Sequence, residues 1–354
     1  MTRLLAAGAV VLASLLGTAK PAAADPAKPT DYRSEILSVH PTLPKGVTVS
    51  VVGGDAFLEL QVDRGHRVVV QDYQQAEGTT PPAYLRVRAD GTVEVNDRSI
   101  AASINESRYG SNSSSARPDE APRWKVVGRD GRYTWHDHRI HWMSPRAPTA
   151  VAPDHRVDMG GTGGTWTVDL RVDGTPVTVR GQLLLLPSPS PVPWLAAVIL
   201  SGGLVLALAA RAVRSRSVPP HGGYAVALAA VAALATLVGT VQWRTIPAGA
   251  GGNPLTAAVP AVAMAAALVA AFVDRSTVRL AGLAAAAATL AGWGLLRREA
   301  LFRAVLPTEL PYAVDRLGTA LALGVGVGVA AVLVWRPPAR PRPSAASRPS
   351  PASA

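Results

Sequence analysis

The residue types most able to do chemistry gather in one segment, residues 135–143, which reads WHDHRIHWM. Imidazole nitrogens bind copper and zinc, a carboxylate can complete the coordination shell, and copper also accepts a thioether. The segment therefore predicts a candidate metal site, with copper as the candidate cofactor and zinc as the alternative. The candidate ligands are His136, His138, His141, Asp137 and Met143, with His155 as an addition from further along the chain.

The same segment also has a structural interpretation. An ion pair between Asp137 and Arg139 would use both charges, and the histidines would bond to backbone groups at a corner of the domain. Trp135 and Trp142 would then be core residues. A third interpretation is pH sensing, because clustered imidazoles titrate near neutral pH.

The choice between these interpretations depends on where the strand that contains His136 ends. Side chains alternate between the two faces of a continuous strand, so His136 and His138 would then lie on the opposite face from His141. A turn or bulge near Arg139 would instead let the three imidazoles converge. The sequence leaves both arrangements open.

No enzymatic activity is predicted. A catalytic nucleophile needs a general base that a third group orients. Ser144 is close to histidines and an aspartate in the sequence, but successive strand residues point to opposite faces, so no catalytic triad is implied. The glycine-rich residues 160–164 are expected to form a hairpin or bulge. A phosphate loop is not expected, because a strand and not a helix follows them.

Hydrophobic runs divide the chain into an exported half and a membrane half. Residues 1–24 combine Arg3, an apolar run and three alanines, which predicts a cleavable signal peptide. Five later runs have about the ~20 residues that a helix needs to cross the hydrocarbon core. These predicted spans lie at residues 194–213, 224–241, 255–273, 278–296 and 317–335, after a Pro-rich spacer at 187–193.

The basic residues concern membrane topology and not a nucleic-acid partner. Residues 25–193 hold 19 Lys and Arg against 20 Asp and Glu, so no nucleic-acid binding is predicted. With residue 25 outside, the inner loops and the tail hold nine arginines and the outer loops five, as the positive-inside rule requires. The sequence therefore predicts a multi-pass protein of the cell membrane with an extracytoplasmic first domain. Its C-terminal tail, residues 336–354, is expected to be disordered and cytoplasmic.

The predicted spans are interpreted as an anchor. None has an acid, a lysine or a histidine in its middle, whereas proton relays and ion pathways need ionisable groups at bilayer depth. Glycines such as Gly324 and Gly328 instead predict close packing of the helices. The outer loop at residues 297–316 is expected to run along the membrane interface and contact the exported domain.

Residues 25–186 predict an all-β domain. Turn signals such as Asp90-Gly91 and Asp130-Gly131 separate short β-prone runs. Strands are expected at residues 47–52, 57–62, 66–70, 84–87, 93–96, 124–127, 133–138, 166–172 and 177–185. This number and spacing predict an immunoglobulin-like antiparallel sandwich. Because the chain has no cysteine, the domain must be stable without disulfides.

This plan of signal peptide, β domain, Pro-rich spacer and helices, with the motif WHDHRIHWM, resembles a family of conserved actinobacterial membrane proteins. That resemblance supplies no reaction. More remotely, the layout is similar to exported copper-handling proteins of the CopC and CopD type, which implies metal as a ligand class. Those proteins carry histidines at the mature N-terminus and within the helices, and this chain does not.

The leading functional prediction is a non-enzymatic protein of the cell envelope whose exported β domain binds a partner or senses a ligand near the membrane surface. The lipid bilayer is one predicted partner, and an envelope protein or the cell wall is another. The competing prediction is copper or zinc binding and handling through residues 136–141.

Overall fold

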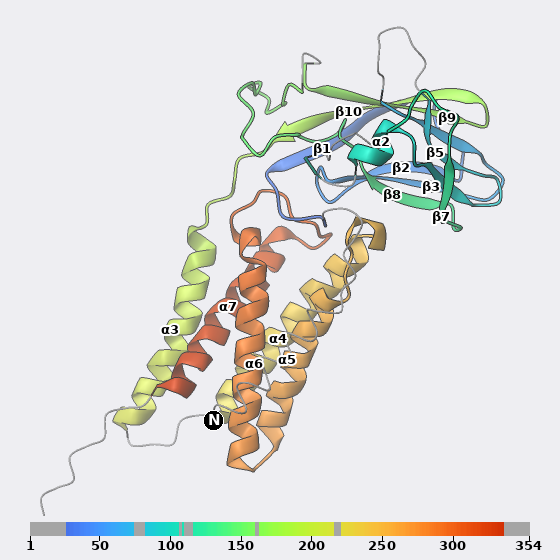
Figure 1. Ribbon diagram of the computed structural model, residues 1–354. Coiled ribbons are helices and arrows are strands. Elements are labelled where there is room, and N and C mark those ends of the chain that lie inside the picture. The colour runs from blue at the N-terminus through green and yellow to red at the C-terminus, as the bar shows by residue number, and fades with distance from the viewer. Residues whose placement is uncertain are drawn as a thin grey trace, which may run out of the picture.

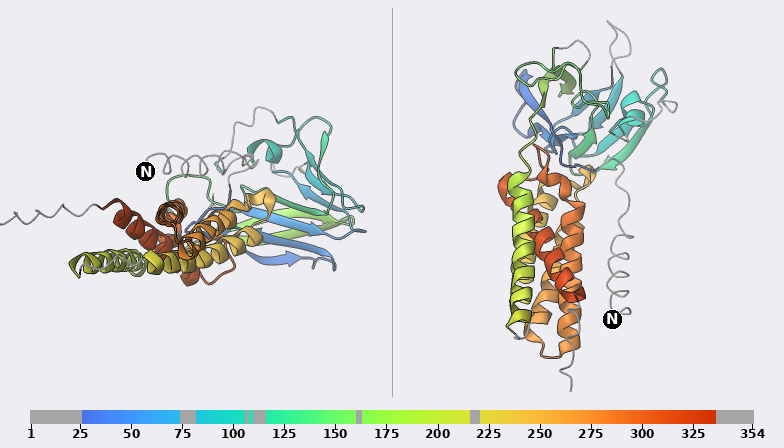
Figure 2. Two further views of the ribbon diagram at one scale, coloured as in Figure 1. Left: turned by 90° about the horizontal axis from the view of Figure 1, so that it is seen from below. Right: turned by 90° about the vertical axis from the view of Figure 1, so that its left-hand side faces the viewer.

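The computed structural model describes residues 26–73, 82–105, 108–109, 116–159, 163–215 and 221–335. A β domain lies beyond one end of a bundle of helices (Figure 1), and two further views show the same arrangement (Figure 2). The predicted signal peptide, the predicted disordered tail and most of the glycine-rich segment 160–164 lie outside the described residues.

The described part of the β domain contains ten strands in two antiparallel sheets. The seven-stranded sheet has the order β1 (Tyr32–His40), β10 (Thr175–Leu185), β9 (Thr165–Val172), β4 (Val68–Gln71), β5 (Ala83–Val87), β6 (Val93–Asn96) and β7 (Trp124–Gly128). The three-stranded sheet has the order β2 (Val47–Val52), β3 (Phe57–Val62) and β8 (Arg132–His136). A short helix, α2 (Ile100–Ile104), follows β6.

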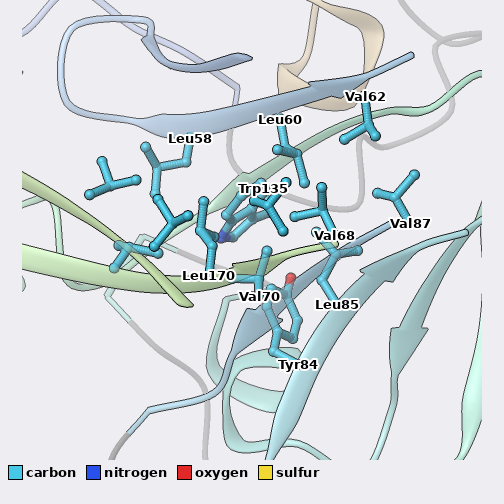
Figure 3. Close-up of a cluster of buried hydrophobic side chains, with 14 of the residues drawn as sticks. Leu58, Leu60, Val62, Val68, Val70, Tyr84, Leu85, Val87, Trp135 and Leu170 are labelled. Atoms are coloured by element: carbon cyan, nitrogen blue, oxygen red, sulfur yellow. The ribbon is translucent and has the colours of Figure 1, made fainter. Parts of the chain in front are cut away.

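The core of the β domain lies between these two sheets. In β9 every second residue is buried, from Trp166 to Val172, while the residues between them face outward. This alternation is the pattern of a strand with one solvated face. Leu58, Leu60 and Trp135 of the smaller sheet meet the larger sheet in a cluster that also contains Val70, Leu85 and Leu170 (Figure 3).

Five helices among the described residues are long and apolar enough to cross a membrane. They are α3 (Val192–Arg214), α4 (His221–Thr245), α5 (Leu255–Phe272), α6 (Ser276–Leu296) and α7 (Tyr312–Val334). The chain is therefore a multi-pass membrane protein. The predicted fold class, an antiparallel β domain followed by about five transmembrane helices, is confirmed.

The last helix begins earlier than the sequence predicts. The hydrophobic run begins at residue 317, but α7 starts at Tyr312, directly after Pro311, and its first turns contain the buried Asp315 and Arg316. Asp315 accepts two hydrogen bonds from Arg297 Nη2, both at 2.8 Å. Arg316 donates to the carbonyl oxygens of Ala300 and of Arg303. Both charged side chains lie at the end of the bundle next to the β domain. Arg297 neutralises Asp315, and backbone carbonyl oxygens accept the hydrogen bonds of Arg316.

Two loops at that end of the bundle hold the β domain. Thr30 and Val305 form an antiparallel bridge with both backbone hydrogen bonds, 3.0 and 2.8 Å long. Arg303 pairs with Asp31 at 2.7 Å. The segment that contains Val305, between α6 and α7, therefore contacts the β domain, as expected for the loop at residues 297–316. The second loop, between α4 and α5, contains the 3-10 helix η2 (Ala248–Ala250).

Candidate functional site

The segment at residues 135–143 leaves the sheet through a tight turn. Strand β8 ends at His136, and the Ile140 amide donates to the Asp137 carbonyl oxygen at 3.1 Å. The Asp137 side chain supports the turn, since the Arg139 amide donates to Asp137 Oδ1 at 3.0 Å. Aspartate often supports a turn through a bond to the amide two residues further on. The chain therefore reverses near Arg139, the second of the two expected arrangements.

Three imidazole rings meet at this turn. The ring centroid of His141 lies 5.4 Å from that of His136 and 5.0 Å from that of His138. The exposed fractions of the three residues are only 1% for His136, 9% for His138 and 0% for His141. The turn thus brings together three of the six predicted ligands. We call these three residues the histidine cluster.

His141 contains a polar atom that its surroundings leave unsatisfied. Its Nδ1 lies 3.2 Å from the carbonyl oxygen of Trp142 and donates to it in the tautomer that this contact favours. Its Nε2 is then an acceptor, and it is buried with no hydrogen-bond partner within the described part of the chain. An unsatisfied buried polar atom costs about 1–3 kcal/mol. Such an atom in a folded protein calls for a physical explanation.

The histidine cluster begins on the side of the smaller sheet that faces the helices. His136 pairs in register with Phe57, and their rings stack with centroids 4.4 Å apart. Phe57 points away from the core of the β domain because Leu58, its neighbour, points into it. Phe57 packs against Ile246 and Ala250 in the loop between α4 and α5. Phe57 therefore contacts both His136 of the histidine cluster and the loop between α4 and α5.

Asp137 has a structural role and does not point to the rings as a ligand. Its Oδ2 accepts a hydrogen bond from Trp135 Nε1 at 2.9 Å and from Arg139 Nη2 at 2.6 Å. Its Oδ1 accepts from Arg139 Nε at 2.8 Å, and the oxygen of the Tyr73 hydroxyl lies 3.4 Å from it. The ion pair with Arg139 and the burial of Trp135 agree with the structural interpretation of the segment.

The side chains of Asp137 and Arg139 stay ionised although they are buried. Burial raises the pKa of Asp137, but the Arg139 guanidinium and the hydrogen bonds outweigh it and hold that pKa below its ordinary value. Burial lowers the pKa of Arg139, but Asp137 more than offsets this and raises it. Burial also raises the pKa of the Tyr73 hydroxyl well above its usual range. Tyr73 therefore remains a neutral donor and acceptor.

A second buried ion pair lies near the cluster. Arg108 pairs with Asp55, whose side chain is fully buried. Burial, and after it the positive charge of Arg108, lower the pKa of His141 to about 3. His141 is therefore neutral at physiological pH, which disfavours this ring as a sensor between pH 5 and 8.

The remaining predicted ligands lie elsewhere. Met143 is 39% exposed. His155 is exposed in a turn, and its own carbonyl oxygen accepts a hydrogen bond from the Leu185 amide at the end of β10. Trp142, expected in the core, is only half-buried, because its Nε1 donates to the Arg146 carbonyl oxygen in an exposed loop. No group of three His, Asp or Glu side chains in the described residues is placed to hold a metal ion as it stands.

Sequence reasoning missed the residues that surround the cluster. Tyr73 precedes it by more than sixty positions, yet its hydroxyl accepts from the His138 amide at 2.8 Å and donates to Asn105 at 2.8 Å. Phe57 and Arg108 likewise come from distant segments. No local pattern marks any of these residues. The pairing of β3 with β8 brings Phe57 to the turn, and Tyr73 and Arg108 reach it from the segments that follow β4 and α2.

Comparison with known proteins finds no matching family model, no matching curated protein and no matching solved structure. The functional argument therefore rests on the site and on its place in the fold.

Proposed function

We propose that the chain is a non-enzymatic protein of the cell envelope, whose β domain binds a partner or senses a ligand at the membrane surface and relays its state to the helices. The observation that carries this proposal is the contact between the β domain and both loops at its end of the bundle. A domain that is merely tethered needs only its spacer, whereas this one also shares hydrogen bonds with each loop.

The contact gives a physical route between the two parts. Ala27 donates through its amide to the Ala250 carbonyl oxygen at 3.2 Å, beside the packing of Phe57 on Ile246. On the other loop, the bridge of Thr30 with Val305 adds two hydrogen bonds. A change at the histidine cluster that displaces Phe57 therefore acts on the loop between α4 and α5.

The proposed location is the cell membrane, with the β domain outside the cytoplasm. The ends of the five helices alternate, so Arg244, Arg297 and Arg316 lie near the β domain, and Arg211 and Arg279 lie at the far end. Arg297 is compensated by Asp315 through a direct ion pair. The positive-inside rule counts Lys and Arg, and by sequence nine arginines fall in the loops and tail away from the β domain against five in the loops beside it, which supports this orientation.

We expect a disulfide between Thr30→Cys and Val305→Cys to form readily in membranes. The two residues are a hydrogen-bonded antiparallel pair, for which the Cα separation of ~5.5 Å lies within the range of disulfides. The chain has no other cysteine. With a protease site placed in the spacer at residues 187–193, cleavage should leave the two halves linked until a reductant is added.

The matched control for this test is Val126→Cys with Val305→Cys. Val126 is exposed on β7, at the opposite edge of the large sheet from β1. The halves of this variant should separate after cleavage. If the halves of the Thr30→Cys, Val305→Cys variant also separate under oxidising conditions, the β domain is not docked and the proposed relay is wrong.

Orientation is tested with a second pair of single cysteines. Asp154 is exposed in the β domain, and Asp274 is exposed in the loop between α5 and α6. On intact cells, a membrane-impermeant maleimide should label the Asp154→Cys variant and should label the Asp274→Cys variant only after permeabilisation. The reverse pattern would place the β domain in the cytoplasm and exclude the envelope function.

A further inference from the structure

We infer that the histidine cluster is a transition-metal site for copper(I), held by the imidazoles of His136, His138 and His141. This inference names the ligand of the sensing domain and in that respect rests on the proposed function. The observation behind it is the convergence of three buried rings, one of which presents an unsatisfied Nε2 atom in the described structure.

The spacing of the rings fits imidazoles that share one ion. A metal–nitrogen bond of ~2.0–2.1 Å places the ion ~3.2 Å from a ring centroid, so two imidazoles on one trigonal or tetrahedral ion have centroids ~5.2–5.6 Å apart. The observed separations from His141 are 5.4 Å to His136 and 5.0 Å to His138. The separation from His136 lies within the expected range and the separation from His138 lies just below it, so His141 is close enough to share an ion with either ring.

The ring orientations, in contrast to the spacing, are not those of a formed site. No three side chains in the described residues are placed to hold a metal as they stand. Binding therefore requires the rings to turn about their Cβ–Cγ bonds. A turn of the His136 ring changes its stacking on Phe57 and thereby the packing of Phe57 on Ile246 and Ala250. Metal binding and docking are coupled through this contact.

The charges around the cluster, within the described residues, favour copper(I) over zinc(II). An imidazole coordinates a metal as a neutral ligand, and the nearby described carboxylates of Asp55 and Asp137 are each paired with an arginine. An ion that enters the cluster is therefore not neutralised by its ligands, and burial of an uncompensated charge is costly. A monovalent ion has the lower cost. Imidazole ligands suit copper as well as zinc.

The other predicted ligands are not part of the proposed site. Both carboxylate oxygens of Asp137 already accept hydrogen bonds from Arg139. Met143 is partly exposed and His155 lies in the turn next to β10. The ligand set is therefore nitrogen alone, which distinguishes this site from a copper site that uses a thioether.

The test is an anaerobic titration of the full-length protein in detergent with copper(I), in competition with a chromophoric chelator, and a separate titration with zinc(II). We expect one copper(I) per chain, bound at least about tenfold more tightly than zinc(II). X-ray absorption of the copper complex should show a shell of nitrogen at ~2 Å and no sulfur. A wild-type protein that binds copper(I) no more tightly than about 10 μM overturns the inference.

Variants assign the ligands. His141→Ala, and His136→Ala together with His138→Ala, should each weaken copper(I) binding by more than about a hundredfold. Met143→Ala and His155→Ala are the matched controls and should leave the affinity unchanged. A sulfur shell, or a loss of affinity in Met143→Ala, would show a different ligand set. The titration and the X-ray absorption spectrum of the wild-type protein are sufficient to test the inference. It can therefore be overturned even if a histidine variant fails to fold.

A last measurement separates this inference from the proposed function. The rate of amide hydrogen exchange in the loop between α4 and α5 is compared between the copper(I) complex and the metal-free form of the wild-type protein, which has no cysteine. We expect copper(I) to change this rate at least about twofold, because the ion displaces Phe57. Copper(I) binding without any change in rate would overturn the relay and leave the metal site standing. A disulfide that forms in a protein unable to bind copper(I) would overturn the metal site alone.

Discussion

Replacement of Asp137 by asparagine is expected to destabilise the β domain by about 3–5 kcal/mol, because it leaves the charge of Arg139 buried without its counterion. Asp137 is fully buried and accepts from Arg139 through two side-chain nitrogens, at 2.8 and 2.6 Å. The same carboxylate accepts from Trp135 Nε1 and supports the turn that gathers the histidine cluster. The measurement is chemical denaturation followed by tryptophan fluorescence, to which Trp135 contributes as one of the eight tryptophans of the chain.

Asp154→Asn is the matched control for Asp137→Asn. It removes the same charge from an ion pair of similar length, 2.7 Å to Arg156, but both side chains of that pair are substantially exposed. Exposed pairs of this kind contribute about 0–1 kcal/mol. If the two variants lose equal stability, the buried ion pair does not hold the turn in place, and the structural account of Asp137 fails.

The pH dependence of stability, compared between wild type and Asp137→Asn, gives a further test. The pKa of Asp137 is lower in the folded protein than its ordinary value, so its carboxylate stabilises the fold at pH values above about 4. This stabilisation is lost as the pH falls through the lowered pKa. The difference in stability between wild type and Asp137→Asn should therefore shrink in acid. If burial had instead raised the pKa of Asp137, the same difference would grow in acid.

Alternation and turn signals made most of the β domain predictable. The nine segments that the sequence marks as strands are all found, and the glycines of the turns at Gly91 and Gly131 adopt positive φ angles of 83° and 71°. Strand β1 was missed because it is an edge strand whose alternation is interrupted by a register shift between Ile36 and Ser38. Its partner strand β10 has the regular alternation of buried and exposed residues that β1 lacks.

The histidine segment was predictable in composition but not in geometry. An aspartate directly after His136 is a turn signal, and it marks where β8 ends. The sequence nevertheless could not place the turn against Phe57 or the loop between α4 and α5, because these contacts depend on the pairing of distant strands and on docking with the bundle. Local chemistry is visible in a sequence, whereas the surroundings that tune it are set by tertiary structure.

The second large effect is expected in the bundle, where Gly324→Ala should reduce stability by about 1–3 kcal/mol through overpacking. A methyl group at Gly324 would collide with Ser201 Oγ and with the Val198 carbonyl oxygen of α3, and the neighbouring backbones are already in close contact at Gly202 and Gly328. Such close approach of small residues is how membrane helices pack. The expected readout is a lower midpoint of thermal unfolding in detergent.

The matched control for Gly324→Ala is Gly203→Ala, in the middle of α3, where an added methyl group meets nothing within 4 Å. Alanine has a higher helix propensity than glycine by up to ~1 kcal/mol. The control should therefore be neutral or stabilising, while Gly324→Ala destabilises in spite of the same gain in propensity. Because the spacer joins β10 to α3, loosening α3 from α7 should also slow the disulfide between Thr30→Cys and Val305→Cys. An unchanged midpoint in Gly324→Ala would mean that the two helices are not packed at these glycines.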